Sequence, residues 1–146
     1  LTKILAVPGL RIGYLLAPPP LAARLRARRQ AWAVNGLALA ACTAACRHPE
    51  RLSPVAARAQ ADRAALAAAL TTIPGLATHP GAAGFVLTDV TDRDATPIAA
   101  ALRRDRGIAV RPASTFPGLG PGHLRLTARG GDADARLVTA LAAALR

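Results

Sequence analysis

Residues 1–14 of the chain read LTKILAVPGLRIGY and include its single lysine, Lys3. The chain has 19 lysine and arginine residues, and all of them except Lys3 are arginine. A guanidinium group stays charged in proteins, whereas an amine can lose its proton and condense with a carbonyl group. A lysine in an arginine-dominated chain is therefore a candidate for a Schiff base.

Arg11 follows Lys3 after eight positions, inside the sequence GLRIG. This pattern resembles the cofactor-lysine segment of the fold-type I pyridoxal-phosphate enzymes, the aminotransferase class I/II superfamily. In that family S-x-[ST]-K is followed eight residues later by the arginine of G-L-R-x-G. The resemblance implies that Lys3 forms a Schiff base with pyridoxal 5'-phosphate, that Arg11 binds its phosphate, and that Thr2 assists at the phosphate. Arginine suits a phosphate because its planar fork makes paired hydrogen bonds.

Two further segments extend the resemblance along the chain. Residues 32–38 (WAVNGLA) are similar to W-x-V-N-x-L-A of the histidinol-phosphate aminotransferase and threonine-phosphate decarboxylase branch. Residues 107–126 are similar to the substrate-binding segment of that branch, where two arginines fourteen positions apart hold a phosphate and an α-carboxylate. The resemblance assigns Arg111 to the phosphate and Arg125 to the carboxylate. It also implies that Asn35 touches the substrate, although an asparagine before a helix can equally be its cap.

The sequence FPGLGPGHLR, residues 116–125, resembles threonine-phosphate decarboxylases of cobalamin biosynthesis more than the aminotransferases of the branch. The resemblance implies a lyase that converts L-threonine O-3-phosphate to aminopropanol phosphate. A histidinol-phosphate-type aminotransferase stays open, because both enzymes need the same lysine and two arginines. The resemblance also implies an amino-acid phosphate as substrate, a homodimer and a cytoplasmic location.

The chain has 146 residues and begins without methionine, inside the family motif. A complete two-domain subunit is longer, at about 100–200 residues per domain. We interpret the chain as the C-terminal part of a longer enzyme, inactive alone. Residues 1–50 would be a remnant of the large cofactor-binding domain, and residues 51–146 the small C-terminal domain. A truncated gene product without activity is a further hypothesis.

The net charge of +11 raises the rival hypothesis of a basic module that binds nucleic acid. The arginines are scattered, however, and aromatic residues for base stacking make up only 3% of the chain. We therefore do not expect nucleic acid as a partner. We also expect no membrane span, because Pro18-Pro19-Pro20 and the arginines interrupt the apolar runs.

Cys42 and Cys46 lie four positions apart on an expected helix, with His48 just beyond. A zinc site normally needs four ligands, and the sequence offers no second cluster. We interpret both cysteines as buried free thiols and expect no metal site. His79 and His123 are interpreted as structural.

Hydrophobic patterning predicts an α/β fold, with helices packed on a small sheet in the C-terminal part. In residues 123–128, alternation places Leu124 and Leu126 on one face and Arg125 on the other. Ser53-Pro54 and Thr96-Pro97 are typical of helix starts. The expected strands cover residues 10–17, 84–90, 108–111 and 123–128, and the expected helices residues 21–32, 35–46, 53–70, 96–106 and 132–146.

Overall fold

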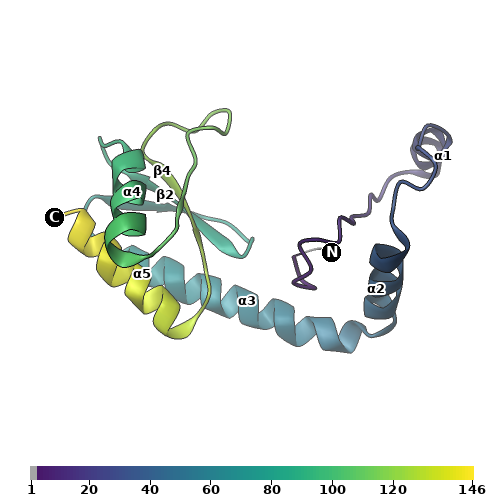
Figure 1. Cartoon of the computed structure of the whole chain (residues 1–146), viewed down its shortest axis with the longest axis horizontal. Coiled ribbons are helices and arrows are strands. Elements are labelled where there is room, and N and C mark those ends of the chain that lie inside the picture. Colours follow the sequence, from purple (N-terminus) through teal and green to yellow (C-terminus); the bar gives the residue numbers. More distant parts are fainter. Residues whose placement is uncertain (1–2) are drawn as a thin grey trace. The chain divides into compact units, whose positions relative to one another are not determined.

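The computed structural model describes residues 3–146, which divide into two compact units (Figure 1). One unit ends at Ala56, and the other runs from Ala57 to Arg146. The predicted domain boundary after residue 50 lies close to this division. The assignment of the two parts to a large and a small domain of one enzyme stays a prediction.

The first unit contains helix α1 (Pro19–Ala27), helix α2 (Gly36–Arg47) and the first turns of helix α3 (Pro49–Leu70). Helix α1 begins with prolines, whose missing N–H group costs nothing in the first turn. Helix α2 begins after Asn35, whose side-chain oxygen accepts the N–H of Ala38 at 2.8 Å. Both helices were predicted, with α1 starting earlier and ending sooner than expected.

The predicted strand over residues 10–17 is wrong. This segment has no regular secondary structure, and Tyr14, Leu15 and Leu16 are exposed by 72%, 70% and 85%. A strand buried on both faces needs flanking strands for its hydrogen bonds and helices that cover it. Among the described residues before Ala57 there is no strand that supplies such a neighbour. Apolar composition alone therefore gave the wrong prediction.

The second unit contains a four-stranded antiparallel sheet in the order β1-β2-β4-β3. The strands are β1 (Leu76–His79), β2 (Phe85–Val90), β3 (Arg111–Pro112) and β4 (His123–Thr127). Strands β2 and β4 were predicted nearly to the residue. Strand β1 was missed because only Leu76 among its four residues is a large apolar residue. The strand predicted over residues 108–111 is displaced, so that Arg111 begins β3 instead of ending it.

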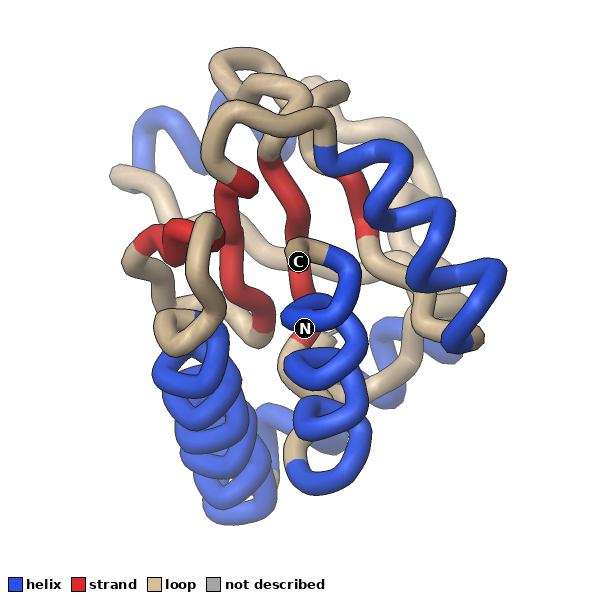
Figure 2. Tube along the Cα trace, turned by 90° about the vertical axis from the view of Figure 1, so that its left-hand side faces the viewer, coloured by secondary structure: helices blue, strands red, loops and turns tan. Residues whose placement is uncertain are grey.

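Helices α3, α4 (Ala95–Arg106) and α5 (Gly131–Ala144) pack against one face of this sheet, as Figure 2 shows. The core between the two layers joins side chains from all three helices to side chains from the strands. Its members include Leu66 and Leu70 of α3, Leu102 of α4, Leu141 of α5, and Val86, Val90, Leu124 and Leu126 of the strands. The fold is the predicted mixed α/β arrangement.

Two predicted helix starts need correction. Helix α3 begins at Pro49 and continues through Pro54, while the hydroxyl of Ser53 donates to the carbonyl of Pro49 at 3.3 Å. Helix α4 is capped by Asp94, whose carboxylate accepts the N–H of Thr96 at 2.7 Å. A Ser/Thr-Pro pair can occupy the first turns of a helix as well as its cap, so the pattern located each helix but not its first residue.

Candidate functional site

The sheet face opposite the helices is open within the second unit. Along β2 the side chains alternate, so that Val86 and Val90 are buried in the core while Phe85, Leu87 and Asp89 are half-buried on the other face. Strand β4 alternates in the same way, as predicted. Its half-buried residues therefore share the open face with those of β2.

A row of four residues crosses this open face. Strand pairing sets His79 opposite Leu87, Leu87 opposite Arg125, and Arg125 opposite Arg111. Directly opposed residues in antiparallel strands point to the same face of the sheet. Arg111 and Arg125 are therefore neighbours, although fourteen positions separate them in the sequence.

The two arginines bring like charges together, an arrangement that destabilises a sheet unless something offsets it. The guanidinium carbon of Arg125 lies 5.0 Å from the ring centre of Phe85, and that of Arg111 lies 4.8 Å from the ring centre of Phe116. Within residues 3–146 neither arginine forms an ion pair. An anion on this face would offset the repulsion.

The Nε atom of Arg125 gives more direct evidence for an anionic ligand on this face. The Nε atom of Arg125 is buried and has no hydrogen-bond acceptor in the described part of the chain. A buried donor without an acceptor is unfavourable, by about 1–3 kcal/mol. A carboxylate or phosphate fits, because its oxygens accept paired hydrogen bonds from a guanidinium group. The arrangement is suited to a ligand with anionic groups.

In the next row of the open face, His123 lies opposite Asp89, and its ring contacts that of His79 in the first row. The rings of His79 and His123 stack with their centres 5.6 Å apart, and Nδ1 of His123 lies 3.8 Å from Asp89. The same Nδ1 lies 3.1 Å from the backbone nitrogen of Gly120. These contacts agree with the structural role expected of both histidines.

The predicted cofactor residues belong to the first unit. The side chain of Lys3 is exposed, and its carbonyl accepts the N–H of Ala6 at 3.2 Å in a turn. The side chain of Arg11 is exposed and donates to the carbonyl of Pro8 at 3.4 Å. Thr2 lies outside the described residues. The predicted roles of all three stay predictions.

Asn35 is engaged as a helix cap through its side-chain oxygen. The cap accounts for an asparagine at this position without any ligand. Its predicted contact with the substrate rests on the resemblance alone and stays a prediction.

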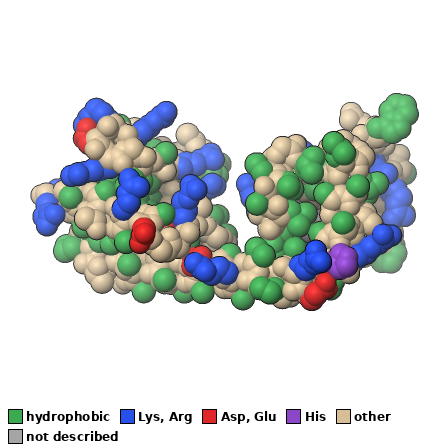
Figure 3. Space-filling model, turned by 60° about the horizontal axis from the view of Figure 1, so that its bottom comes forward, with side chains coloured by type: hydrophobic (Ala, Val, Ile, Leu, Met, Phe, Trp, Pro, Cys, Tyr) green, Lys and Arg blue, Asp and Glu red, His purple; other side chains and the backbone are tan. Residues whose placement is uncertain are grey.

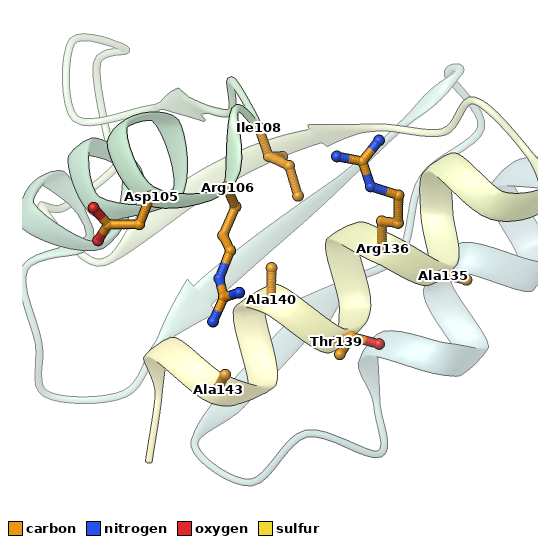
Figure 4. A pocket seen from close by; sticks show the side chains of 8 residues that line it. All are labelled: Asp105, Arg106, Ile108, Ala135, Arg136, Thr139, Ala140 and Ala143. Atoms are coloured by element: carbon orange, nitrogen blue, oxygen red, sulfur yellow. The ribbon is translucent and has the colours of Figure 1, made fainter.

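A cavity of about 550 Å³ lies between α4 and α5, in the helix layer and away from the arginine pair (Figure 4). Arg106 and Arg136 line it, together with Ile108 and small side chains of α5. In Figure 4 the guanidinium groups of Arg106 and Arg136 point in different directions. The cavity therefore offers no convergent set of polar groups, and none of the predicted site residues lines it.

The cysteines differ partly from the prediction. Cys42 is half-buried, but Cys46 is exposed, and neither forms a disulfide. Partial burial raises the pKa of the Cys42 thiol, and neighbouring Cys46 raises it further. Among residues 3–146, no group of three or more His, Cys, Asp or Glu side chains is arranged to hold a metal ion.

The surface shows basic side chains in separate groups. On the face drawn in Figure 3, they are spread over both units, with hydrophobic and neutral atoms between them. In the part of the chain that the structure describes, no helix is both long and apolar enough to cross a membrane.

Together, a small antiparallel sheet, a helix layer on one face and a guanidinium pair on the other define an α/β domain whose open face carries two neighbouring positive charges. The chain belongs to the aminotransferase class I and II family, whose model matches residues 1–143. This is a family of enzymes that use pyridoxal phosphate. The resemblance seen in the sequence is thus confirmed, and with it the fold type.

Individual relatives point to two activities. The chain is 40% identical over 144 residues to a histidinol-phosphate aminotransferase of Symbiobacterium thermophilum, covering 99% of this chain and 38% of the relative. The crystal structure of L-threonine-O-3-phosphate decarboxylase from Porphyromonas gingivalis matches with a TM-score of 0.84 and 28% identity. That match covers 96% of this chain and 43% of the decarboxylase chain.

A third similar structure contains the cofactor. It is histidinol-phosphate aminotransferase from Sinorhizobium meliloti in complex with pyridoxal-5'-phosphate, with a TM-score of 0.77 and 28% identity. The match covers 98% of this chain and 39% of that chain. The chain therefore spans about two fifths of the length of these relatives.

Lys3 and Arg11 of the first unit have the functional groups needed to bind this cofactor. Lys3 offers an amine for an aldehyde, and Arg11 offers a guanidinium for a phosphate, on one short loop. Both side chains are exposed. Within the described residues, the Arg11 guanidinium makes one hydrogen bond, the long one to Pro8, which leaves most of its donors for a ligand.

Sequence reasoning missed the two aromatic partners of the arginine pair. Phe85 and Phe116 are the only phenylalanines in the chain, and each stacks against one arginine. Their rarity was a usable signal. The pairing itself could not be read from the sequence, because it depends on strand register and on the path of the loop between β3 and β4.

Proposed function

We propose that the protein containing this chain is a pyridoxal-phosphate-dependent lyase that decarboxylates L-threonine O-3-phosphate during cobalamin synthesis. The observation that carries the proposal is the pairing of Arg111 and Arg125 on one open face, where neither has an ion-pair partner among residues 3–146. Threonine phosphate has two anionic groups, a phosphate and a carboxylate, one for each guanidinium. The similarity to the Porphyromonas gingivalis decarboxylase supports it.

Each residue has a distinct role in this proposal. Lys3 and Arg11 hold the cofactor, which when bound supplies an electron sink for the substrate's α-carbon. Arg111 binds the substrate phosphate, and Arg125 binds the carboxylate through two parallel hydrogen bonds. The amine of Lys3 then delivers a proton to the α-carbon after carbon dioxide leaves. The orientation that Arg125 imposes favours breaking the bond to the carboxylate over the bond to hydrogen.

The second candidate is a histidinol-phosphate-type aminotransferase. The specific observation in its favour is the 40% identity to the Symbiobacterium thermophilum enzyme. In this case Arg111 would still bind a phosphate, while Arg125 would bind the carboxylate of the amino-group donor or acceptor. The same residues serve both reactions, so the products must decide between them.

A product assay on the protein expressed from its full coding sequence separates the candidates. The enzyme is incubated with pyridoxal phosphate and threonine phosphate, and separately with histidinol phosphate and 2-oxoglutarate. Aminopropanol phosphate from the first mixture supports the decarboxylase. Glutamate from the second, with no aminopropanol phosphate from the first, supports the aminotransferase. Turnover in neither mixture would overturn both candidates.

We further propose that the protein acts as a homodimer in the cytoplasm, as the family resemblance implies. Sedimentation of the protein expressed from its full coding sequence tests the assembly, with twice the subunit mass as the expected result. Salt-sensitive binding of duplex DNA, without any change in cofactor absorbance when pyridoxal phosphate is added, would instead favour the rival nucleic-acid-binding module.

A further inference from the structure

Both phenylalanines of the chain lie at the arginine pair. Phe85 is half-buried at the start of β2, diagonally across from Arg125, since strand pairing sets Phe85 opposite Thr127 and Leu87 opposite Arg125. Phe116 lies in the loop between β3 and β4 and is 36% exposed. The distances from guanidinium carbon to ring centre, 5.0 Å and 4.8 Å, fall within the range of cation–π contacts.

Burial in the core does not explain either ring. The core cluster lies on the helix side of the sheet and includes neither phenylalanine. Phe85 points to the other face, because its neighbour Val86 points into the core. A large apolar side chain on an open face gains less from burial than one in the core. Contact with an arginine guanidinium explains why an aromatic ring lies at each of these two positions.

The loop holds Phe116 in a defined place. Its N–H donates to the carbonyl of Ala113 at 3.0 Å, and its carbonyl accepts the N–H of Leu119 at 3.1 Å. Ala113 is itself only 1% exposed and donates its N–H to the carbonyl of His123 in β4. The backbone that carries Phe116 is thus tied to the strand that carries Arg125, and the ring itself contacts Arg111.

An aromatic ring can hold an arginine side chain in place without occupying the N–H donors of the guanidinium group. The five N–H groups of a guanidinium lie in its plane, whereas an aromatic ring contacts its flat face. A carboxylate partner would instead occupy the N–H groups and neutralise the charge. Two arginines supported by rings therefore keep their charge and their donors for a ligand.

We propose that Phe85 and Phe116 are positioning residues that direct Arg125 and Arg111 to the two anionic ends of the substrate. This inference rests on the proposed function, since it assigns the carboxylate to Arg125 and the phosphate to Arg111. Phe85 then determines how the carboxylate is oriented, and Phe116 determines the preference for a phosphorylated substrate. Each phenylalanine acts through its arginine and does not itself touch the reacting atoms.

The test compares leucine and tyrosine at each position, in the protein expressed from its full coding sequence and loaded with pyridoxal phosphate. Leucine keeps an apolar side chain but removes the ring, while tyrosine keeps the ring. Phe116→Leu is expected to raise KM for the phosphorylated substrate about 3- to 10-fold with little change in kcat. Phe85→Leu is expected to lower kcat/KM by a similar factor, with part of the loss in kcat. Phe116→Tyr and Phe85→Tyr should stay close to wild type.

A specificity ratio separates positioning from a general structural effect. Phe116→Leu should reduce the preference for threonine phosphate over threonine, or for histidinol phosphate over histidinol, whereas Phe85→Leu should leave that preference unchanged. Equal kinetics for wild type and both leucine variants, or equal losses with leucine and tyrosine, would overturn the inference alone. A wild-type enzyme without activity on either phosphorylated substrate would overturn the proposed function and this inference with it.

Discussion

Arg125, for which we propose a role in substrate binding, lies between two strand residues that belong to the core. The guanidinium of Arg125 stacks on Phe85, and its Nε has no acceptor among the described residues. The flanking residues Leu124 and Leu126 are fully buried on the opposite face. Substitutions along this strand should therefore separate activity from stability.

We predict that Arg125→Lys lowers kcat/KM of the protein expressed from its full coding sequence by about 10- to 100-fold. An ammonium group is a point charge and cannot make the paired hydrogen bonds of a guanidinium. Steady-state kinetics on the substrate identified in the product assay measure the effect. Arg129→Lys, at an exposed position just beyond β4, is the control and should behave like wild type. Full activity of Arg125→Lys would contradict the role of Arg125 as the carboxylate ligand.

Leu124→Ala should lower the free energy of unfolding by about 2–5 kcal/mol, because the substitution leaves a cavity in a closely packed core. Arg125→Met at the next position should change the free energy of unfolding far less. The substitution removes one of two opposed like charges, together with a buried donor that has no acceptor in the described part of the chain. Urea unfolding of the 146-residue chain, followed by circular dichroism, compares the two. A similar decrease in the free energy of unfolding for both variants would show that the sheet face carrying Arg125 is packed against other residues in solution.

At the level of elements, the two ends of helix α4 are set by residues outside the core. Helix α4 begins at a cap formed by Asp94 and ends at Gly107, which adopts a positive φ of 65°. Glycine takes this left-handed conformation without the strain that other residues incur. The Gly107 end was predicted from the sequence, while the Asp94 cap was not.

The cap should make stability depend on pH. Hydrogen bonds from the backbone and side chain of Thr96 lower the pKa of Asp94 below its ordinary value of 3.8. Because the pKa is lower in the folded state, the charged cap stabilises the fold above pH 3.8, and this contribution is lost as the pH falls through the lowered folded-state pKa. We predict that Asp94→Ala lowers the Tm at neutral pH and that the difference from wild type shrinks in acid. A difference that is the same at both pH values would show that the charge plays no part.

Sequence patterns worked best for elements whose two faces differ. Strands β2 and β4 were predicted because buried and half-buried residues alternate along them. The pattern failed for residues 10–17, whose apolar composition requires covering neighbours that the described chain does not supply. The Arg111–Arg125 pair was expected to bind one substrate by resemblance, but its place on opposed strands depends on register, which the sequence does not reveal.

At the level of the whole molecule, the two units differ in how much core they contain. In the described part of the first unit, Ala38 is the only buried hydrophobic residue, whereas the second unit holds the core cluster. Many large apolar side chains of the first unit are exposed, and Trp32 is exposed by 96%. The second unit has the packing that cooperative folding requires, and the first unit has little of it.

We predict that limited proteolysis of the 146-residue chain first cuts at sites before residue 57 and leaves a resistant fragment that begins near that residue. Backbone that packs few apolar side chains opens readily to proteases. Mass spectrometry of the fragments locates the cuts. Fluorescence of Trp32, the single tryptophan of the chain, should be quenched efficiently by iodide. Protection of the first unit, or a shielded tryptophan in the monomeric chain, would contradict the account.

The most direct test of the central claim is chemical labelling of Lys3. The protein expressed from its full coding sequence is incubated with pyridoxal phosphate, reduced with sodium borohydride, digested, and analysed by mass spectrometry. The account predicts a phosphopyridoxyl group on the peptide that contains Lys3, and loss of this label together with activity in Lys3→Arg. A label that maps reproducibly to a different lysine, or full activity of Lys3→Arg, would contradict it.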